Sequence, residues 1–464
     1  METKNKVKVR FAPSPTGFLH MGNARMAVLN YLLAKKLNGE FLLRIDDTDT
    51  KRSQEEYTVA IKDALKWLGV SWSEEFRQSN RLDVYNDILQ KLEQEGRVYK
   101  CYETPEELEY AKNLQLAKKL PPIYNRSALS LTKEQKEQYV KEGRKPYYRF
   151  KIEPGEIAWN DICKGHLSFK GEHLSDPVIV REDGSFLYIL TSVIDDAEKK
   201  ITHILRGEDH IVNTAVQIQM FKCLNAPIPQ FAHMPIVTNT EGKKLSKRDG
   251  DFSISDLQKQ GYLPLSIIYT LFSLGLGDHA NIYTTIEEII EHFDISKYGK
   301  ATAQFDSKKL AQNNLHLLKL QPFEKIKNMS KEFLNLGICE NFYNKVKNNI
   351  EQFSDIKLWH DIVFEDITSS VLEKKELLNK EVLEITLATL PKVDFTLDTW
   401  GMWQKDIKEK LSNSYPNINS KTIFTTLRVA LTGLTHGMEF KDLLILLGLV
   451  KTKERLFKAI DILK

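Results

Sequence analysis

Two short polar segments of this 464-residue chain combine residue types that can bind phosphate groups. The first, PSPTGFLHMGN at residues 13–23, lies between an alternating apolar run and a segment of helical periodicity, which predicts a strand-to-helix turn. Its glycines allow close backbone approach, N–H groups at a helix start favour anions, and His20 can donate a hydrogen bond to a phosphate oxygen. Taken alone, the same composition is also typical of an ordinary turn.

The second segment, GKKLSKRDG at residues 242–250, follows the strand-like run HMPIVTN. Lys244, Lys247 and Arg248 concentrate positive charge in a loop that also contains serine and glycine. Such a loop can neutralise the charge that develops on a polyphosphate leaving group. A basic run of this kind is more often a solvated surface turn, so the second segment gains its meaning from the first.

The elements around the first segment predict a βαβ unit. KVKVRFA alternates apolar and charged residues as a strand does, and the apolar residues between Ala24 and Ala34 recur at helical spacing. Asn38-Gly39 ends the helix before a second strand, FLLRI, and two amphipathic helices follow through residues 61–68 and 82–92. This order predicts a parallel sheet, whose strand ends form one ligand-binding rim.

The sheet pattern is interrupted and then resumes. Residues 99 to about 190 mix helix and strand, with YYRFKI and PVIV as short strands, and we interpret them as an insertion. ITHILRGED and HMPIVTN then predict further sheet strands, each running into polar loop residues. Beyond about residue 321 almost every segment has helical periodicity, most clearly LLILLGLV and RLFKAIDIL.

The composition predicts a globular protein of several domains. The chain has 42% hydrophobic and 28% charged residues, and at roughly 150 residues per domain its length suggests about three units or more. A net charge of +3 carries no strong electrostatic signal for nucleic acid. The four cysteines lie far apart, which indicates reduced thiols. The charged N-terminus and the lack of an apolar run of ~18 residues predict a cytoplasmic protein that does not interact with membranes, and we expect a monomer.

With both segments present in this order, the chain resembles the class I aminoacyl-tRNA synthetases, whose signatures are a HIGH-like and a KMSKS-like sequence. HMGN at residues 20–23 and KLSKR at residues 244–248 are similar to these signatures. The contexts RFAPSPTGFLH, RIDDTD, HILRGEDH and FAHMP resemble the glutamyl subgroup more narrowly. The similarity runs through residues 7–320 and returns at LRVALTG, residues 427–433.

The resemblance implies a multidomain fold. An α/β Rossmann-like catalytic domain with a parallel sheet is split by an inserted α+β domain that holds the acceptor stem of tRNA, and an all-α anticodon-binding region follows. The boundaries expected in this sequence are 1–98 and 191–240 for the catalytic halves and 99–190 for the insertion. A stem-contact domain with the KLSKR loop would span 241–320, and a helical region of two subdomains would span 321–464.

The resemblance also implies a reaction, in which ATP activates L-glutamate and the product is transferred to the 3′ ribose of tRNA(Glu) without a covalent enzyme intermediate. His20, Lys244 and Lys247 would be catalytic, and Mg²⁺ would accompany ATP. The residues expected at ATP are Pro13, Ser14, Pro15, Thr16, Gly17, His20, Gly22, Asn23, Glu208, Lys244, Leu245, Ser246, Lys247 and Arg248.

For the amino-acid pocket the resemblance implies Arg10, Asp46, Tyr188 and Arg206. A carboxylate side chain needs a bidentate cation, which either arginine can supply, although a single arginine is as often a surface residue. Asp46 departs from the family pattern Arg-x-Glu-Asp-Thr-Asp, in which the Glu engages the amino group of the substrate. Asp46 is one methylene shorter, so either the pocket shifts or a water fills the gap.

Many relatives carry a zinc knuckle of the Cys-x-Cys … Cys-x-His type in the inserted domain. In this chain YKCYETPEE keeps only Cys101, and IYNRSAL offers neither cysteine nor histidine. Four soft ligands cannot be assembled from these residues, so we predict no structural zinc and no other bound metal in the protein itself.

The helical region bears on the choice of tRNA. Family members that reject tRNA(Gln) place an arginine where the third anticodon base is inspected, and in VKNNIEQFSDIKLW this position is Gln352. A glutamine amide can donate or accept, so the chain could charge tRNA(Gln) as well as tRNA(Glu). The alternative is a solvated glutamine on a helix.

Other functions are disfavoured by particular residues. A noncatalytic tRNA-binding paralogue of the same fold would not need an intact KLSKR and His20. A nucleotide-dependent oxidoreductase would carry GxGxxG after the first strand, where this chain has none. Glutaminyl-tRNA synthetases end in β-barrels, and truncated relatives that modify a tRNA base lack the C-terminal region.

Overall fold

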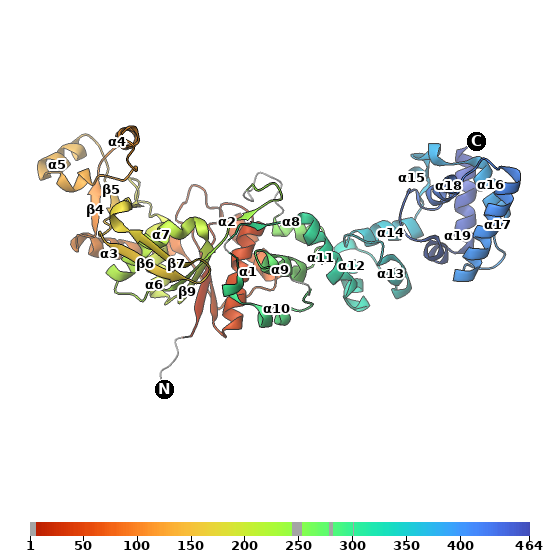
Figure 1. Ribbon diagram of the computed structural model, residues 1–464, viewed down its shortest axis with the longest axis horizontal. Coiled ribbons are helices and arrows are strands. Elements are labelled where there is room, and N and C mark those ends of the chain that lie inside the picture. Colours follow the sequence, from red (N-terminus) through yellow and green to blue (C-terminus); the bar gives the residue numbers. More distant parts are fainter. Residues whose placement is uncertain (1–5, 244–252, 278–281, 300) are drawn as a thin grey trace. The chain divides into compact units, whose positions relative to one another are not determined.

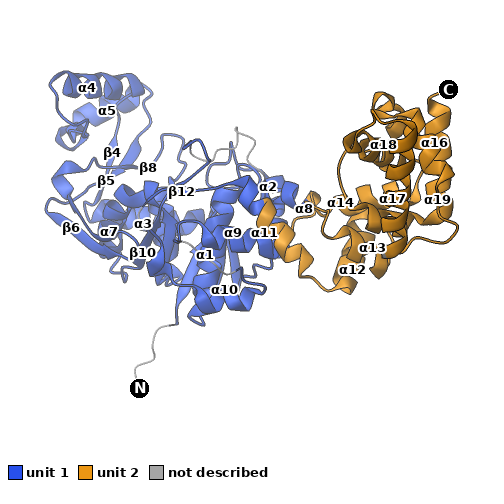
Figure 2. Ribbon diagram, turned by 45° about the vertical axis from the view of Figure 1, so that its right-hand side comes forward, with its two compact units in different colours: residues 1–258, 264–310 blue, residues 259–263, 311–464 orange. Residues whose placement is uncertain are grey.

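The computed structural model describes residues 6–243, 253–277, 282–299 and 301–464 (Figure 1). The contacts between residues divide the chain into two compact units, shown in Figure 2. Unit 1 comprises residues 1–258 and 264–310, and unit 2 comprises residues 259–263 and 311–464. All the described strands belong to unit 1, so the sheet and the helical region separate as the sequence predicts.

A parallel sheet forms the centre of unit 1. Strands β1 (Lys8–Phe11), β2 (Glu40–Ile45) and β3 (Glu74–Arg77) pair in parallel in the order β1-β2-β3, and β9 (His203–Gly207) pairs in parallel with β10 (Gln230–Met234). The backbone N–H of Thr202 donates to the carbonyl of Lys8 at 2.9 Å, which brings β9 beside β1. The strand order reverses between β1 and β9, and doubly wound folds bind ligands at such a point.

The helices that cover this sheet are α1 (Met21–Lys36), α2 (Glu55–Trp67), α3 (Leu82–Gln94), α6 (Tyr188–Glu198) and α7 (Ile211–Cys223). Helix α1 packs against β1, β2 and β9 and is buried along most of its length. It ends where Asn38 adopts a φ of 50°. A Cβ atom on Gly39 would lie 2.4 Å from the carbonyl oxygen of Val7, so the turn into β2 requires glycine there. The predicted βαβ unit is confirmed.

The region predicted as an insertion has two parts. Its distal part has a small core of Tyr99, Cys101, Ala128 and Tyr147, and contains helices α4 (Pro105–Ala117) and α5 (Lys133–Lys141). Strands β4 (Val98–Cys101), β5 (Tyr147–Phe150) and β8 (Val178–Val180) form an antiparallel sheet. The hairpin of β6 (Glu156–Asp161) and β7 (Gly165–Lys170) packs against β10, and Ile157 of β6 lies in the same apolar core as Ile204 and Phe231 of the central sheet.

The predicted strand HMPIVTN is interrupted. Strand β10 ends at Met234 and β11 (Val237–Thr238) pairs with β12 (Ala303–Gln304) instead. Pro235 lacks a backbone N–H and cannot continue a ladder, so the prediction of one continuous strand is wrong. The rest of unit 1 is helical, with α9 (Pro264–Ser273) and α10 (Ile286–His292), and α8 (Ile254–Lys259) follows the KLSKR segment.

In the residues that the structure describes, unit 2 is entirely helical, as predicted. Its helices are α11 (Ser307–Lys319), α12 (Phe323–Leu334), α13 (Glu340–Val346), α14 (Asp355–Phe364), α15 (Thr368–Leu372), α16 (Lys380–Ala388), α17 (Leu397–Ser414), α18 (Ser420–Thr432) and α19 (Phe440–Ile462). The segments LLILLGLV and RLFKAIDIL both lie in α19, which is kinked at Gly448, where φ is 70° and ψ is 171°. Only glycine adopts this conformation without strain.

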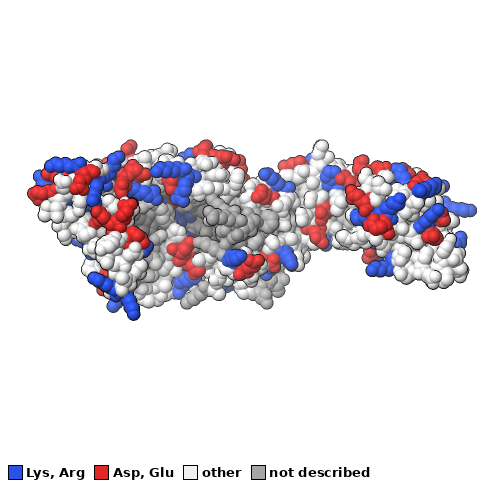
Figure 3. Space-filling model, turned by 90° about the horizontal axis from the view of Figure 1, so that it is seen from above, with Lys and Arg blue, Asp and Glu red and all other residues white. Residues whose placement is uncertain are grey.

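Basic and acidic side chains are interspersed on the face of the molecule drawn in Figure 3, in keeping with the small net charge. None of the described helices combines the length and the apolar character that crossing a membrane requires.

Candidate active site

A cavity of about 510 Å³ lies at the carboxyl ends of β1 and β9, where the strand order reverses. Ten residues that the sequence singled out line it, and they come from four separate parts of the chain. They are Arg10, Pro13, Ser14, Thr16, His20, Gly22, Asn23, Asp46, Tyr188 and Arg206. The fold therefore brings most of the predicted ATP and glutamate residues to one site.

The loop before α1 is fixed by backbone hydrogen bonds to the segment after β2. Asp46 N–H donates to the Pro13 carbonyl at 2.9 Å, and Gln54 N–H donates to the Pro15 carbonyl at 3.0 Å. A Cβ atom on Gly22 would lie 3.2 Å from the His20 ring, so glycine leaves room for the imidazole at the start of α1. The first turn of α1 contains no acidic residue, and its N–H groups can meet an anion.

The KLSKR segment itself, Lys244, Leu245, Ser246, Lys247 and Arg248, lies outside the described residues. The chain that leaves it is described and returns to the first motif. Ser253 forms a β-bridge with His20, and Ile254 N–H donates to the Leu19 carbonyl at 2.9 Å. Two described residues that follow the second motif, Ser253 and Ile254, therefore contact the first motif.

Three of the residues predicted at ATP do not line the cavity. Pro15 and Gly17 lie in the loop before α1 but are not among the lining residues. Glu208 uses one carboxylate oxygen to accept a hydrogen bond from the Ile236 N–H at 3.0 Å, and the other forms an ion pair with Lys164. This carboxylate joins the end of β9 to the segment after β10, and its contact with ATP stays a prediction.

Buried ion pairs organise one side of the cavity. Asp196 accepts from Arg10 at 3.0 and 3.2 Å and from Arg44 at 2.8 Å. Arg44 also donates to both carboxylate oxygens of Asp46, at 2.6 and 3.2 Å. Burial raises the pKa of Asp46 to about 6, although Arg44 acts against it. The short side chain of Asp46 is therefore already held by an arginine two residues earlier in the chain.

Arg206 is buried but differs from Arg10 and Arg44 in its partners. Its guanidinium donates to Tyr188 Oη at 3.0 Å, to Thr214 Oγ1 at 2.6 Å and to Gln217 Oε1 at 2.7 Å, all of them neutral groups. Within the described part of the chain, no carboxylate lies within 4 Å of it. Burial lowers the pKa of Arg206 because the positive charge is removed from water. The cavity thus contains a cation whose counter-ion is not part of the described chain.

Comparison with known proteins shows the family. The model of the catalytic domain of class I tRNA synthetases, "E and Q", matches residues 6–312, and the model of an anticodon-binding domain matches residues 310–460. The chain belongs to the class I tRNA synthetases of the E and Q group. The cavity lies wholly within the part that matches the catalytic domain.

Full-length relatives are similar over almost the whole chain. It is 43% identical to "Glutamate--tRNA ligase 1" of Rickettsia felis over 456 residues, which cover 98% of this chain and 100% of the relative. It is 43% identical to "Glutamate--tRNA ligase 2" of Rickettsia canadensis, covering 97% and 99%. Among solved structures, a glutamate tRNA ligase of Elizabethkingia meningosepticum in complex with its amino acid aligns with a TM-score of 0.79 at 29% identity, covering 99% and 100% of the two chains.

Several side chains of this synthetase site were not predicted from the sequence. Arg44 lies inside the apolar strand FLLRI, Asp195 and Asp196 lie in the apolar helix YILTSVIDD, and His233 lies between apolar residues in FAHM. All four are buried. A charged or titratable residue inside an apolar run is unusual, because its burial requires a partner, and that signal was available in the sequence.

The position of the zinc knuckle of related synthetases is filled by hydroxyl groups around one carboxylate. Glu103 accepts from Tyr124 Oη at 2.6 Å, from Ser127 Oγ at 2.7 Å and from Tyr147 Oη at 3.1 Å. Burial raises the pKa of the nearby Cys101 thiol to about 12, which opposes the thiolate form that zinc binds. The described residues contain no cluster of three or more His, Cys, Asp or Glu side chains suited to a metal. This donor set does not fit zinc.

Gln352 lies in the part of the synthetase that matches the anticodon-binding domain. It is exposed, in the turn before α14, and its backbone N–H donates to Asp355 Oδ2 at 2.9 Å. The alternative of a solvated glutamine on a helix holds for its exposure but not for the helix, because α14 begins only at Asp355, after its N-cap Ser354.

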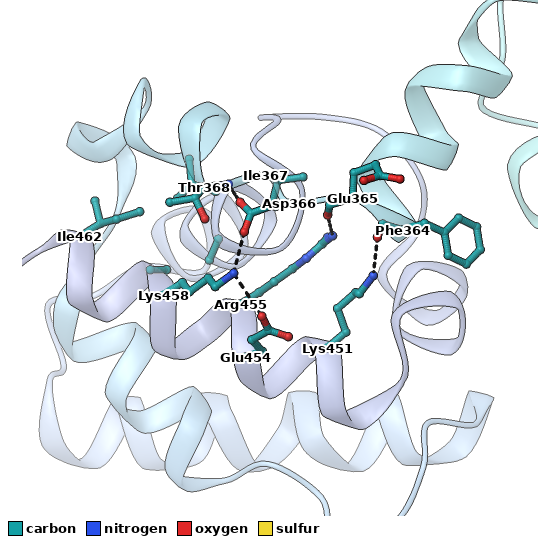
Figure 4. Close-up of a pocket in the computed structure, with 13 residues that line it drawn as sticks. Phe364, Glu365, Asp366, Ile367, Thr368, Lys451, Glu454, Arg455, Lys458 and Ile462 are labelled. Atoms are coloured by element: carbon teal, nitrogen blue, oxygen red, sulfur yellow. Dashed lines mark hydrogen bonds and ion pairs between the residues drawn. The ribbon is translucent and has the colours of Figure 1, made fainter. Parts of the chain in front are cut away.

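A second cavity, of about 150 Å³, lies in unit 2 beside α19 (Figure 4). Lys451, Arg455 and Lys458 line it from α19. Lys451 donates to the carbonyls of Val363 and Phe364 at 3.0 and 2.9 Å, and Lys458 pairs with Asp366 at 2.7 Å. These basic groups are occupied by the protein itself.

Proposed function

We propose that this chain is a glutamate–tRNA ligase. It activates L-glutamate with ATP and transfers the glutamyl group to the 3′ terminal ribose of tRNA(Glu) in the cytoplasm. The observation that carries the choice of amino acid is Arg206, a buried cation at the catalytic cavity that has only neutral partners among the described residues. The names of the 42–43% identical relatives support the same reaction.

In this proposal the side-chain carboxylate of glutamate supplies the missing negative charge. Arg206 has five N–H donors, and four of them are directed at Tyr188, Thr214, Gln217 and His233. The remaining donor is available to a carboxylate, and Arg10 provides a second guanidinium on the same cavity. Asp46, which also lines the cavity, is the acceptor for the substrate amino group.

The phosphates of ATP would lie at the start of α1. Its N–H groups and His20 would donate to phosphate oxygens, and the positive charges of Lys244 and Lys247 would neutralise phosphate charge. The α-carboxylate oxygen of glutamate forms a bond to the α-phosphorus as the bond to pyrophosphate breaks. The enzyme contributes positioning and charge stabilisation, because no side chain is modified. Mg²⁺ would accompany the nucleotide and would neutralise phosphate charge when bound with it.

The remaining assignments concern tRNA. Residues 99–190 would hold the acceptor end, 241–320 would contact the stem, and 321–464 would bind the anticodon, with the enzyme acting as a monomer. Gln352 would inspect the third anticodon base and accept both tRNA(Glu) and tRNA(Gln). The match of residues 310–460 to an anticodon-binding domain supports the last region.

The test is ATP–pyrophosphate exchange that depends on glutamate, measured with tRNA present. Lys247→Ala should lower the exchange by about 10²-fold or more, because one group that stabilises transition-state charge is lost. Lys243→Ala is the matched control, since Lys243 is exposed and pairs with Glu241 in its own turn, and it should leave exchange unchanged. Binding of tRNA without any exchange would contradict the proposal and would point to a noncatalytic paralogue.

A further inference from the structure

A chain of buried hydrogen bonds leads from the inserted region to Arg206. Asp161, at the end of β6, lies with Oδ2 2.6 Å from His233 Nδ1. His233 Nε2 lies 2.8 Å from Thr214 Oγ1, and Thr214 Oγ1 accepts from Arg206 Nη2 at 2.6 Å. The exposed fraction of these four side chains is 6% or less, so water does not compete for the contacts.

The polarity of this chain follows from its first member. Asp161 Oδ1 accepts three backbone N–H groups, from Cys163 at 3.1 Å, Lys164 at 3.0 Å and His233 at 3.1 Å. Although burial opposes its ionisation, these bonds and the one from the His233 ring hold the pKa of Asp161 below its usual value. An ionised carboxylate only accepts hydrogen bonds, so the proton of His233 must lie on Nδ1.

The other ring nitrogen is then an acceptor. Burial lowers the pKa of His233, which keeps the imidazole neutral at pH 7. Nε2 accepts the hydroxyl proton of Thr214, whose alternative acceptor, the carbonyl of His210, is farther away at 3.2 Å. The oxygen of Thr214 is left to accept from Arg206, and Arg206 Nε also faces Nε2 at 3.4 Å. The donor and the acceptor of each hydrogen bond from Asp161 to Arg206 are therefore fixed.

The sheet places these residues in register. His233 of β10 and Arg206 of β9 are paired positions on neighbouring parallel strands, so their side chains leave the same face. The His233 ring is stacked on Phe231, with the ring centroids 6.1 Å apart and 10° between the planes. Packing therefore restricts the imidazole to the orientation that the hydrogen bonds require.

We propose that Asp161, His233 and Thr214 are positioning residues that hold the Arg206 guanidinium in one orientation for the side-chain carboxylate of the amino-acid substrate. This role rests on the proposed function of Arg206. We call the hydrogen bonds that connect Asp161, His233, Thr214 and Arg206 the relay. The acceptors beside Arg206 are all neutral, so the relay orients the cation without cancelling its charge. A carboxylate at the same distance would have formed an ion pair and weakened the attraction for an acidic substrate.

The test compares two substitutions of one residue. His233→Phe keeps a planar ring but removes the Nε2 acceptor, and should raise KM for glutamate roughly tenfold, as expected for one buried hydrogen-bond partner. KM for ATP should not change. His233→Gln places an amide oxygen near the position of Nε2 and should recover most of the affinity for glutamate. His203→Phe, at the other end of β9, is the matched control and should not alter either constant.

Asp161→Asn provides a readout that packing alone would not move. The asparagine oxygen must still accept the three backbone N–H groups, so its NH₂ group faces Nδ1 and forces the proton of His233 onto Nε2. Nitrogen-15 NMR of histidine-labelled protein should show an Nδ1-protonated imidazole in the wild type. This signal should be absent from His233→Gln, which assigns it, and should become an Nε2-protonated signal in Asp161→Asn.

The outcomes separate the two proposals. If the wild type activates no glutamate, the proposed function fails, and the tautomer of His233 still decides whether the relay exists. If the wild type activates glutamate but folded His233→Phe has an unchanged KM for glutamate, the positioning role is wrong and the proposed function stands. If His233→Phe does not fold, the glutamate KM of Asp161→Asn decides: an increase supports the relay, and an unchanged value overturns it.

Discussion

Arg206 in unit 1 and Arg455 in unit 2 are both buried, with 6% and 5% of their surface exposed, and both line a cavity. Neither has a carboxylate within 4 Å in the described part of the chain. The two differ in what accepts their hydrogen bonds. Arg206 is held by side chains, whereas Arg455 donates to the backbone carbonyls of Leu431 and Ile362, both at 2.5 Å. It also donates to the carbonyl of Glu365 at 3.1 Å (Figure 4).

The carbonyl partners of Arg455 lie at the ends of two helices. Leu431 is in the last turn of α18, and Ile362 and Glu365 belong to the last turn and the C-cap of α14. Helix ends leave carbonyls without intrahelical partners and carry partial negative charge, so a buried cation there completes the fold. A cavity and an arginine therefore do not make a binding site by themselves. Arg206 differs because its partners are neutral side chains and not helix-end carbonyls with partial negative charge, so more of its charge is left for a ligand.

The largest effect that this comparison predicts is on Arg206→Ala. Without the cation, a bound glutamate carboxylate would be desolvated and unpaired, which costs about 3–5 kcal/mol or roughly 200- to 5,000-fold in kcat/KM for glutamate. Glutamate-dependent exchange, measured on folded protein, gives this loss. The free energy of unfolding should also fall, by about 2–3 kcal/mol, because buried Tyr188, Thr214 and Gln217 lose their donor. Unchanged kcat and KM for glutamate would show that the substrate binds elsewhere.

Arg455→Met should lower stability without a loss of glutamate activation. It keeps most of the side-chain volume but leaves three buried carbonyls without their donor, which should destabilise unit 2 by about 2–3 kcal/mol. Urea unfolding measures the change, and exchange activity below the unfolding transition should equal that of the wild type. A large loss of glutamate activation with unchanged stability would remove the distinction between the two arginines.

The sequence was sufficient to predict the parallel sheet, the helical C-terminal region and ten of the residues that line the catalytic cavity. Apolar periodicity and turn residues act over short stretches of chain, so β1, α1 and β2 could be located directly. The partners of the functional residues could not. Asp161 and His233 are 72 positions apart, and only the packing of the β6–β7 hairpin on β10 brings them together. The break at Pro235 was visible, but its consequence, the pairing of β11 with β12, is a tertiary contact.

Glu103 sharpens the comparison, because it is a charged residue at a third cavity, in the inserted region. Hydroxyl groups occupy both of its oxygens, so we expect it to act like Arg455, in stability and not in catalysis. Glu103→Gln removes the charge and turns one acceptor into a donor that faces hydroxyl groups, which should destabilise the inserted region by about 1–2 kcal/mol. Hydrogen exchange in β4 and β5 would measure this.

The same cluster predicts a pH dependence. Burial opposes the ionisation of Glu103, but the hydrogen bonds from Tyr124 and Ser127 hold its pKa below the usual value of 4.5. A depressed folded-state pKa means that the stabilisation is complete above about pH 4.5 and is lost as the pH falls through the folded-state value. The stability difference between wild type and Glu103→Gln should therefore shrink below pH 4.5. A difference that is constant from pH 7 to about 3 would mean that the charge of Glu103 is not what stabilises the cluster.

Purified protein should also contain no stoichiometric zinc, and bound zinc would overturn the zinc-free prediction.

The smallest effect concerns Gln352, a residue of unit 2 that, unlike Arg455, is exposed. Its backbone N–H donates to Asp355 Oδ2, and its backbone carbonyl accepts from the Asp355 N–H. Its substitution should leave stability unchanged and alter only recognition. A glutamine amide presents both a donor and an acceptor, whereas a guanidinium presents donors alone and suits one base pattern.

If the wild type charges both tRNA(Glu) and tRNA(Gln), Gln352→Arg should lower charging of tRNA(Gln) about tenfold relative to tRNA(Glu), a difference of about 1.4 kcal/mol. Glutamate would be offered to each purified tRNA in turn, with Glu351→Arg as a control for an added positive charge at the neighbouring exposed position. A wild-type preference for tRNA(Glu) of about a thousandfold would exclude dual charging. If Gln352→Arg and Glu351→Arg had equal effects, positive charge near α14 would be the cause, and position 352 would not inspect the base.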